Sequence, residues 1–127
     1  MDKPKKRILV VDDEASITRM LKLNLERTGK FEVMTENSPH HALTAAISFH
    51  PDLIMLDVLM PGKDGSELAS DFQASPALKH VPVVFLTAAA TKDEVKTHHG
   101  KIGGLPFLAK PVDLHEVIEC LEQNLGG

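Results

Sequence analysis

Several side chains able to take part in phosphate chemistry stand at the ends of short apolar runs. They are two carboxylates after the first run, one after the third, a hydroxyl after the fourth and an ammonium after the last: Asp12, Asp13, Asp57, Thr87 and Lys110. Neighbouring carboxylates raise each other's pKa unless a cation compensates their charge. Mg²⁺ is usually held by one or two carboxylates, waters and phosphate oxygens. We therefore expect a Mg²⁺ site where the three aspartates meet.

Beside such an ion, Asp57 could act as a nucleophile toward a phosphoryl donor and form an aspartyl phosphate. The ion would neutralise the phosphoryl oxygens, while Thr87 offers a hydroxyl donor and Lys110 a mobile ammonium. Each group alone also suits an ordinary role: an aspartate or threonine at a helix cap or turn, a lysine on the surface. Their occurrence together at predicted strand ends favours the chemical interpretation.

Five apolar runs predict the strands that position these groups, over residues 8–11, 31–35, 53–57, 81–86 and 105–109. Apolar residues at three-to-four spacing predict helices over 17–25, 42–47, 68–72 and 114–121, and the more polar segment 91–99 is a candidate for a fifth. This alternation predicts an α/β fold, a flavodoxin-like doubly wound sheet of five parallel strands in the order 2-1-3-4-5 with five helices. The order places the first and third strands side by side and brings all the groups above to one rim.

The predicted sheet has two edges. The partly alternating strand 31–35 belongs at one of them and ends with nothing reactive. Pro106 places the last strand at the other edge, where its missing N–H breaks no ladder bond. Ser38 followed by Pro39 predicts the start of the second helix, and Asp113 opens the last one.

Size and composition predict one soluble domain over residues 1–127, without an output domain. A net charge of −4 and the absence of Trp and Tyr argue against a nucleic-acid surface. The single cysteine, Cys120, excludes an intramolecular disulfide, and no run is long enough to cross a membrane or to serve as a signal peptide. These features predict a cytoplasmic location. The 7 histidines are scattered without metal-ligand spacing, and we expect them on the surface.

Taken together, these motifs resemble the receiver domain of two-component response regulators (CheY-like). The likeness covers nearly the whole chain and comprises four motifs in the family's order: Asp12-Asp13, the block 57–65, Thr87-Ala88 and Lys110-Pro111. It implies that Asp57 accepts phosphate, with Mg²⁺, from a phosphohistidine on a histidine kinase or histidine phosphotransfer protein. The protein would then be a signalling switch rather than an enzyme with turnover.

The resemblance also implies the roles of individual residues in metal binding. Asp13 and Asp57 would bind Mg²⁺ directly, and Asp12 would act mainly through water. The backbone carbonyl of Leu59 would complete the protein ligands.

Further roles implied by the resemblance concern the last strand. The Lys110-Pro111 peptide bond would be cis. Phe107 would be the switch aromatic residue, whose rotamer is coupled to Thr87. Without the resemblance, Phe107 is interpreted as a core residue, and this interpretation competes with the switch role.

Members of this family commonly use the face made by the fourth helix, the fifth strand and the fifth helix for output. This chain departs from the family there, with Gly104-Leu105-Pro106 before the aromatic residue and His98-His99 in a polar fourth helix. The sequence therefore leaves open the output partner, and whether the chain is a monomer or a phosphorylation-linked dimer.

Three other functions remain as alternatives. A phosphatase of the haloacid dehalogenase type would need a second aspartate where Leu59 stands. A flavin- or nucleotide-binding flavodoxin-like domain would need Gly, Ser or Thr after the first strand, where the acidic residues 12–14 would repel phosphate. The third alternative is an interaction module with an inactive site.

Leu59 and Ala89 each stand two residues beyond a group of the phosphate site, and both are apolar. Neither side chain can orient an attacking water, so we expect the acyl phosphate to decay slowly. Leu59→Asn combined with Ala89→Glu should speed this decay, measured as the loss of the phosphoryl increment from the intact mass. An unchanged decay rate would refute the hypothesis.

Overall fold

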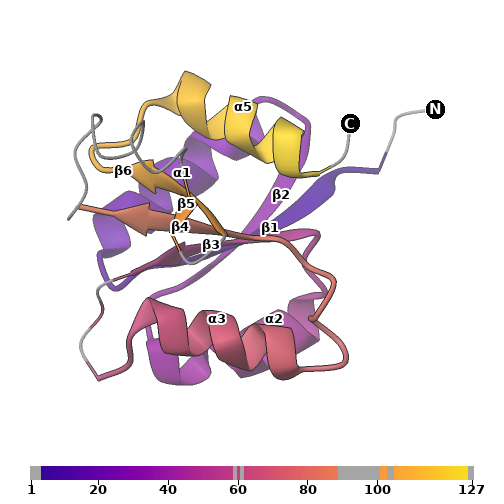
Figure 1. The fold of residues 1–127 in the computed structure, drawn as a ribbon. Helices are drawn as coiled ribbons and strands as arrows, with labels where there is room; N and C mark the ends of the chain where they lie inside the picture. Colours follow the sequence, from indigo (N-terminus) through magenta and orange to yellow (C-terminus); the bar gives the residue numbers. More distant parts are fainter. Residues whose placement is uncertain (1–3, 59, 61, 89–100, 103–104, 126–127) are drawn as a thin grey trace.

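A mainly parallel β-sheet runs through the centre of the molecule (Figure 1). The computed structural model describes residues 4–58, 60, 62–88, 101–102 and 105–125. In spatial order, its parallel strands are β2 (Phe31–Glu36), β1 (Lys6–Val11), β3 (Leu53–Asp57), β4 (Val83–Thr87) and β6 (Leu105–Ala109). The predicted order 2-1-3-4-5 of five parallel strands is confirmed.

Helices cover both faces of the sheet, as a doubly wound fold requires. Within the described residues they are α1 (Ala15–Arg27), α2 (Ala42–Phe49), α3 (Gly65–Ala74) and α5 (Leu114–Asn124), with a short 3₁₀ helix η1 (Pro39–His41) ahead of α2. Figure 1 shows α1 and α5 on one face and α2 and α3 on the other. Four of the five predicted helices are thus confirmed, and the segment 91–99 of the remaining one lies outside the described residues.

Each central strand contains a continuous apolar run, over residues 8–11 in β1, 53–56 in β3 and 83–86 in β4, because helices cover both faces of the sheet there. In β1, Leu9 and Val11 pack in a cluster with residues of α2 and α3, whereas Ile8 and Val10 pack with residues of α1 and α5. Successive residues of a strand point to opposite faces, which explains this division. Packing on both sides fixes β1 and its neighbour β3 in the middle of the molecule, and their carboxyl ends are held with them.

Two predictions about the edges of the sheet have different outcomes. β2 lies at one edge, as predicted. The prediction that Pro106 places the last parallel strand at the other edge is wrong, because the two-residue strand β5 (Lys101–Ile102) pairs antiparallel with β6 beyond it. A pairing of two residues makes few ladder bonds, so the N–H that proline lacks does not prevent it.

Two predictions about helix starts also differ in outcome. Asp113 caps α5 as predicted, and its carboxylate accepts the backbone N–H of His115 at 2.8 Å and of Glu116 at 3.3 Å. The prediction for Ser38 and Pro39 is confirmed only for the 3₁₀ helix: Ser38 is the N-cap residue of η1 and Pro39 its first residue, but the Ser38 side chain makes no capping hydrogen bond and α2 itself begins at Ala42. A 3₁₀ turn comes first, as is common at the N-termini of α-helices.

The surface agrees with the polar character of the sequence. Those histidines that the structure describes are exposed: His40, His41, His50, His80 and His115. Cys120 is half-buried and packs with the apolar residues of α5, as a small hydrophobic residue does. Among the described residues, no helix combines the length and apolar character needed to cross a membrane.

Candidate functional site

The ends of four neighbouring strands meet at one rim of the sheet. Asp12 follows directly after β1, and Asp57 is the last residue of the adjacent strand β3. Thr87 ends β4, on the other side of β3. Lys110 follows directly after β6, its backbone N–H donates to the Thr87 carbonyl at 2.9 Å, and the Lys110–Pro111 peptide bond is cis. Parallel topology therefore brings together the carboxylates, hydroxyl and lysine that stand at separate places in the sequence.

Asp12, Asp13 and Asp57 form an acidic cluster at this rim, with one carboxylate oxygen of each lying within 4.8 Å of the others. Asp12 is fully buried and Asp57 is 4% exposed, whereas Asp13 is exposed. Two buried negative charges and a third at the opening need a compensating cation. The donor set consists of carboxylate oxygens and is open to solvent at Asp13, which fits a hard divalent cation such as Mg²⁺.

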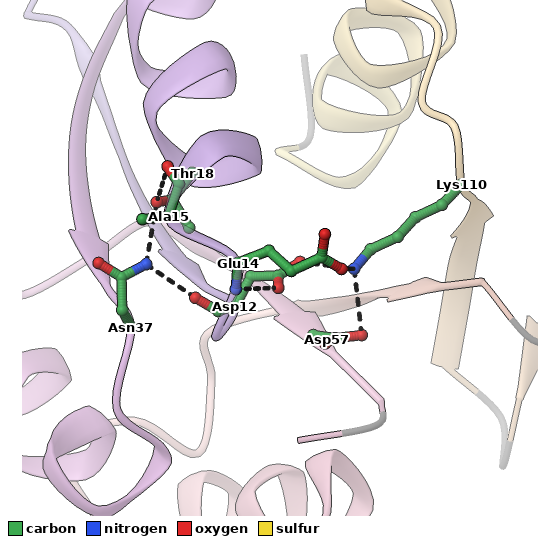
Figure 2. Close-up of polar contacts among 7 residues, drawn as sticks. All are labelled: Asp12, Glu14, Ala15, Thr18, Asn37, Asp57 and Lys110. Carbon is green, nitrogen blue, oxygen red and sulfur yellow. Dashed lines mark hydrogen bonds and ion pairs between the residues drawn. The ribbon is translucent and has the colours of Figure 1, made fainter. Parts of the chain in front are cut away.

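The Lys110 ammonium lies among the carboxylates of Asp12, Asp57 and Glu14 (Figure 2). Its Nζ is 2.8 Å from Asp12 Oδ2, 3.5 Å from Asp57 Oδ1 and 3.4 Å from Glu14 Oε1. The Lys110 side chain is only 9% exposed, so screening by water is weak. One ammonium thus compensates part of the negative charge at the rim.

The protonation of Lys110 follows from two opposing effects. Burial of the ammonium lowers the pKa of Lys110, but the hydrogen bond with Asp12 and the surrounding negative charges raise it by more. The net result is a pKa above the usual value for lysine. Lys110 is therefore positively charged at neutral pH and is able to pair with an anion that enters the site.

Asp12 is held through both its side chain and its backbone. Its Oδ1 accepts the backbone N–H of Glu14 at 2.9 Å, and its carbonyl accepts a hydrogen bond from Asn37 Nδ2 at 2.8 Å (Figure 2). Asn37 directly follows β2 and also donates to Thr18 Oγ1 at 3.0 Å. Sequence reasoning missed Asn37, although the rule that places the other strand ends on this rim applies equally to β2.

The turn after β3 brings the first residue of α3 against the end of the strand. The Gly65 N–H donates to the Val58 carbonyl at 2.9 Å. A Cβ at Gly65 would lie 2.8 Å from Val58 Cα and closer still to the carbonyl oxygen of Asp57. Only glycine fits this approach, so Gly65 belongs to the structure that positions Asp57.

Thr87 and Phe107 are both buried, at 2% and 4% exposure. Phe107 lies opposite Phe85 of β4 and belongs to the core cluster on the α2 and α3 side of the sheet. This placement fits a core residue, and a switch role for Phe107 stays a prediction. Two residues invoked from the sequence, Leu59 and Ala89, lie outside the described residues.

A doubly wound parallel sheet with a buried acidic cluster and a lysine at the carboxyl ends of its strands suits phosphoryl chemistry assisted by a divalent cation. A family model described as "Response regulator receiver domain" matches residues 8–122 of the chain. The chain therefore belongs to the receiver-domain family of two-component response regulators. Receiver domains are signalling modules that bind Mg²⁺ at an acidic site and interact with histidine kinases or phosphotransfer proteins.

Individual relatives agree with this assignment. The alkaline phosphatase synthesis transcriptional regulatory protein PhoP of Bacillus subtilis is 40% identical over 114 residues, which cover 88% of this chain and 45% of PhoP. The polar-differentiation response regulator DivK of Brucella ovis is 30% identical over 122 residues, 95% of this chain and 97% of DivK. Chemotaxis protein CheY4 of Vibrio cholerae superposes with a TM-score of 0.81 at 29% identity, covering 95% of this chain and 99% of that one. The chain thus spans less than half the length of PhoP and nearly all of DivK and CheY4.

Proposed function

We propose that this chain is a phosphorylation-dependent signalling switch in which Asp57 accepts a phosphoryl group from a phosphohistidine. The donor is a histidine kinase or a histidine phosphotransfer protein. The observation that carries the proposal is the position of the Lys110 ammonium, 2.8 Å from Asp12 Oδ2 and 3.5 Å from Asp57 Oδ1. A fixed positive charge stands beside the nucleophile, where it can stabilise the charge of an incoming phosphoryl group.

Mg²⁺ is the cofactor in this proposal. Asp13 and Asp57 would bind the ion directly, Asp12 would act mainly through water, and the Leu59 carbonyl would be a further ligand. The different role of Asp12 is supported by the partners that its two carboxylate oxygens already have, a backbone N–H at 2.9 Å and the lysine ammonium at 2.8 Å. The bound ion supplies neutralisation of the phosphoryl oxygens.

The protein's own groups then carry out the transfer. A carboxylate oxygen of Asp57 bonds to phosphorus while the bond from phosphorus to the histidine nitrogen breaks, and the imidazole leaves with that electron pair. Lys110 exchanges its contacts with the carboxylates for a phosphoryl oxygen, and the Thr87 hydroxyl donates to another. Catalysis by positioning and charge lets the chain assist its own phosphorylation without turning over a substrate.

Output follows from the elements that carry Thr87 and Lys110. Thr87 ends β4, which pairs with β6 so that Phe85 lies opposite Phe107. Movement of Thr87 toward the phosphoryl group changes the packing of Phe107, and with it the output face of the family, to which β6 and α5 belong. A partner protein or a second copy of the chain recognises the altered face, so the switch acts as a monomer or as a phosphorylation-linked dimer.

Incubation with a small phosphodonor such as acetyl phosphate and Mg²⁺, followed by intact mass measurement, tests the proposal. The wild type should gain one phosphoryl increment and Asp57→Asn none. Asp64→Asn is a matched control, because the Asp64 carboxylate lies in the same turn but caps α3 by accepting the Ser66 N–H at 3.1 Å. This control should be phosphorylated like the wild type.

Each other outcome points to a different function. A phosphoryl increment that survives in Asp57→Asn would remove Asp57 from its role. A wild type that binds a kinase but never gains phosphate would favour the interaction module with an inactive site. Continued release of phosphate from an ester would revive the phosphatase, although Leu59 stands where that family needs its second aspartate.

A further inference from the structure

One side-chain amide joins three segments around the acidic cluster. Asn37 Nδ2 donates to the Asp12 carbonyl at 2.8 Å and to Thr18 Oγ1 at 3.0 Å. The Thr18 hydroxyl in turn donates to the Ala15 carbonyl at 3.1 Å (Figure 2). Three hydrogen bonds thus tie together the end of β1, the start of α1 and the residue that follows β2.

The chemistry of the partners fixes the direction of each bond. A carbonyl oxygen only accepts, so the NH₂ group of Asn37 must face Asp12. The Thr18 hydroxyl gives its single proton to Ala15 and accepts from Asn37 with a lone pair. Thr18 is 2% exposed, so water has little access to the hydroxyl lone pair that accepts from Asn37. The network therefore has one arrangement in which every member is satisfied.

The bond to the Asp12 carbonyl acts on the residue that follows. The Asp12 carbonyl and the Asp13 N–H belong to one planar peptide group. A hydrogen bond that holds the carbonyl oxygen therefore also fixes the direction of the bond from the Asp13 nitrogen to its Cα. Asp13 is exposed, and packing against neighbours restricts it little. We propose that Asn37 is a positioning residue that holds the Asp12–Asp13 peptide in the orientation needed for Mg²⁺ binding. The proposal depends on the proposed function of the site.

Mg²⁺ binding by isothermal titration calorimetry, with urea unfolding of the same samples, tests this role. Asn37→Ala and Thr18→Val should weaken Mg²⁺ binding about 10-fold, as the loss of a partner that orients a metal ligand typically does. Thr18→Ser keeps the hydroxyl and should bind like the wild type. Asn24→Ala is the matched control, because Asn24 Nδ2 donates to the Met20 carbonyl at the same 2.8 Å but within α1.

Backbone amide NMR without Mg²⁺ gives a second readout that does not depend on the metal. The Asp13 amide resonance should shift in Asn37→Ala and stay in place in Asn24→Ala. If Asn37→Ala keeps the wild-type Mg²⁺ affinity, Asn37 is only structural and the proposal is overturned, whether or not the stability or the Asp13 resonance changes. A different result would overturn the proposed function instead: the wild type neither binds Mg²⁺ nor accepts phosphate, although the Asp13 resonance differs between the wild type and Asn37→Ala.

Discussion

Burial distinguishes two lysine–aspartate pairs of similar length in this protein. Lys110 Nζ lies 2.8 Å from Asp12 Oδ2, and the side chains are 9% and 0% exposed. Lys63 Nζ lies 2.6 Å from Asp71 Oδ2, with the side chains 30% and 40% exposed. Removing one partner of a buried pair leaves the other charge without compensation or solvent, whereas water takes over from a lost partner at the surface. Only the first pair is therefore expected to matter for stability.

Lys110→Met should lower the free energy of unfolding by about 3–5 kcal/mol in buffer without Mg²⁺, measured by urea denaturation at pH 7. Lys63→Met should lose much less. Added Mg²⁺ should restore more stability to Lys110→Met than to the wild type, because a divalent cation replaces the missing charge. Equal losses in the two variants would contradict this account of the rim.

The pH dependence of the same variant has a definite sign. The pKa of Lys110 is raised in the folded protein, so the Lys110 charge adds to the free energy of unfolding. This contribution is complete below the usual pKa of lysine and disappears as the pH rises through the raised pKa of the folded protein. The wild type should therefore lose this part of its stability only at alkaline pH, and Lys110→Met should show no such loss.

At the scale of elements, two glycines end or begin helices for different physical reasons. Gly29 follows α1 with φ +77°, and a Cβ there would meet no atom within 4 Å. Gly65 begins α3, and a Cβ there would overlap the backbone at the end of β3. The first needs glycine for its backbone conformation, and the second needs it for space.

Gly65→Ala should lower the free energy of unfolding by about 3 kcal/mol, because backbone rather than a flexible side chain must move. Gly29→Ala should cost about 1 kcal/mol, the strain of a left-handed residue with a Cβ. Phosphorylation with a small donor should slow in Gly65→Ala, where the end of β3 shifts, and not in Gly29→Ala. Urea denaturation and intact mass measure the two effects, and a normal phosphorylation rate in Gly65→Ala would argue against its positioning of Asp57.

The edge strand β2 is covered by two side chains of α1. The backbone N–H and C=O groups of the even-numbered residues of β2 point toward β1, as the hydrogen bond from the Asp12 N–H to the Glu36 carbonyl indicates. The backbone groups of Val33 therefore point away from β1, toward the open edge of the sheet. Its carbonyl accepts from Lys22 Nζ at 2.7 Å, and its N–H donates to Glu26 Oε2 at 3.1 Å. These bonds occupy groups that an unprotected edge would offer to another strand.

The double variant Lys22→Ala with Glu26→Ala should lose about 1–2 kcal/mol of unfolding free energy and associate with increasing concentration, measured by urea denaturation and sedimentation. Lys63→Ala with Asp71→Ala removes the same charges elsewhere and should remain at the wild-type mass. If the Lys22→Ala, Glu26→Ala double variant keeps the wild-type association state, Lys22 and Glu26 do not protect the edge strand β2.

The pH dependence of the Glu26 interaction has the opposite sign to that of Lys110. The hydrogen bond from the Val33 N–H lowers the pKa of Glu26. The contribution of Glu26 to the free energy of unfolding is therefore present above the usual glutamate pKa and is lost as the pH falls through the lowered pKa.

At the scale of the whole molecule, the acidic cluster lies at the rim of the sheet and is separate from the hydrophobic core. The two apolar clusters lie on opposite faces of the sheet and consist of residues other than the site's carboxylates. Folding therefore depends on burial of these clusters, and metal binding adds to a structure that is already formed.

Chelation should accordingly leave the protein folded, and Mg²⁺ at 100 times its dissociation constant should add about 2.7 kcal/mol to the free energy of unfolding. Because the chain has no Trp or Tyr, circular dichroism during urea titration is the suitable probe. Asp13→Asn should reduce the gain at the same Mg²⁺ concentration. Unfolding on chelation, or an undiminished gain in Asp13→Asn, would contradict this expectation.

The fold was predictable in outline because its signals are local. Four-residue apolar runs ending in polar groups indicate buried parallel strands, and the chirality of the crossovers leaves few orders for five of them. Details that depend on contacts between distant segments were not predictable. Strand β5 pairs through two residues without a pattern of its own, and α2 begins after a 3₁₀ turn that the Ser38-Pro39 signal does not distinguish from a helix start.

By itself, the sequence determined the five parallel strands, their order and the gathering at one rim of Asp12, Asp13, Asp57, Thr87 and Lys110, because side-chain period and chain connectivity are properties of the chain alone. Tertiary structure decided which atoms meet there: the lysine ammonium among three carboxylates, the Asn37 amide on the Asp12 carbonyl, and Gly65 against the end of β3. Such contacts depend on the reach and rotamer of side chains from elements far apart in sequence, and no local pattern encodes them.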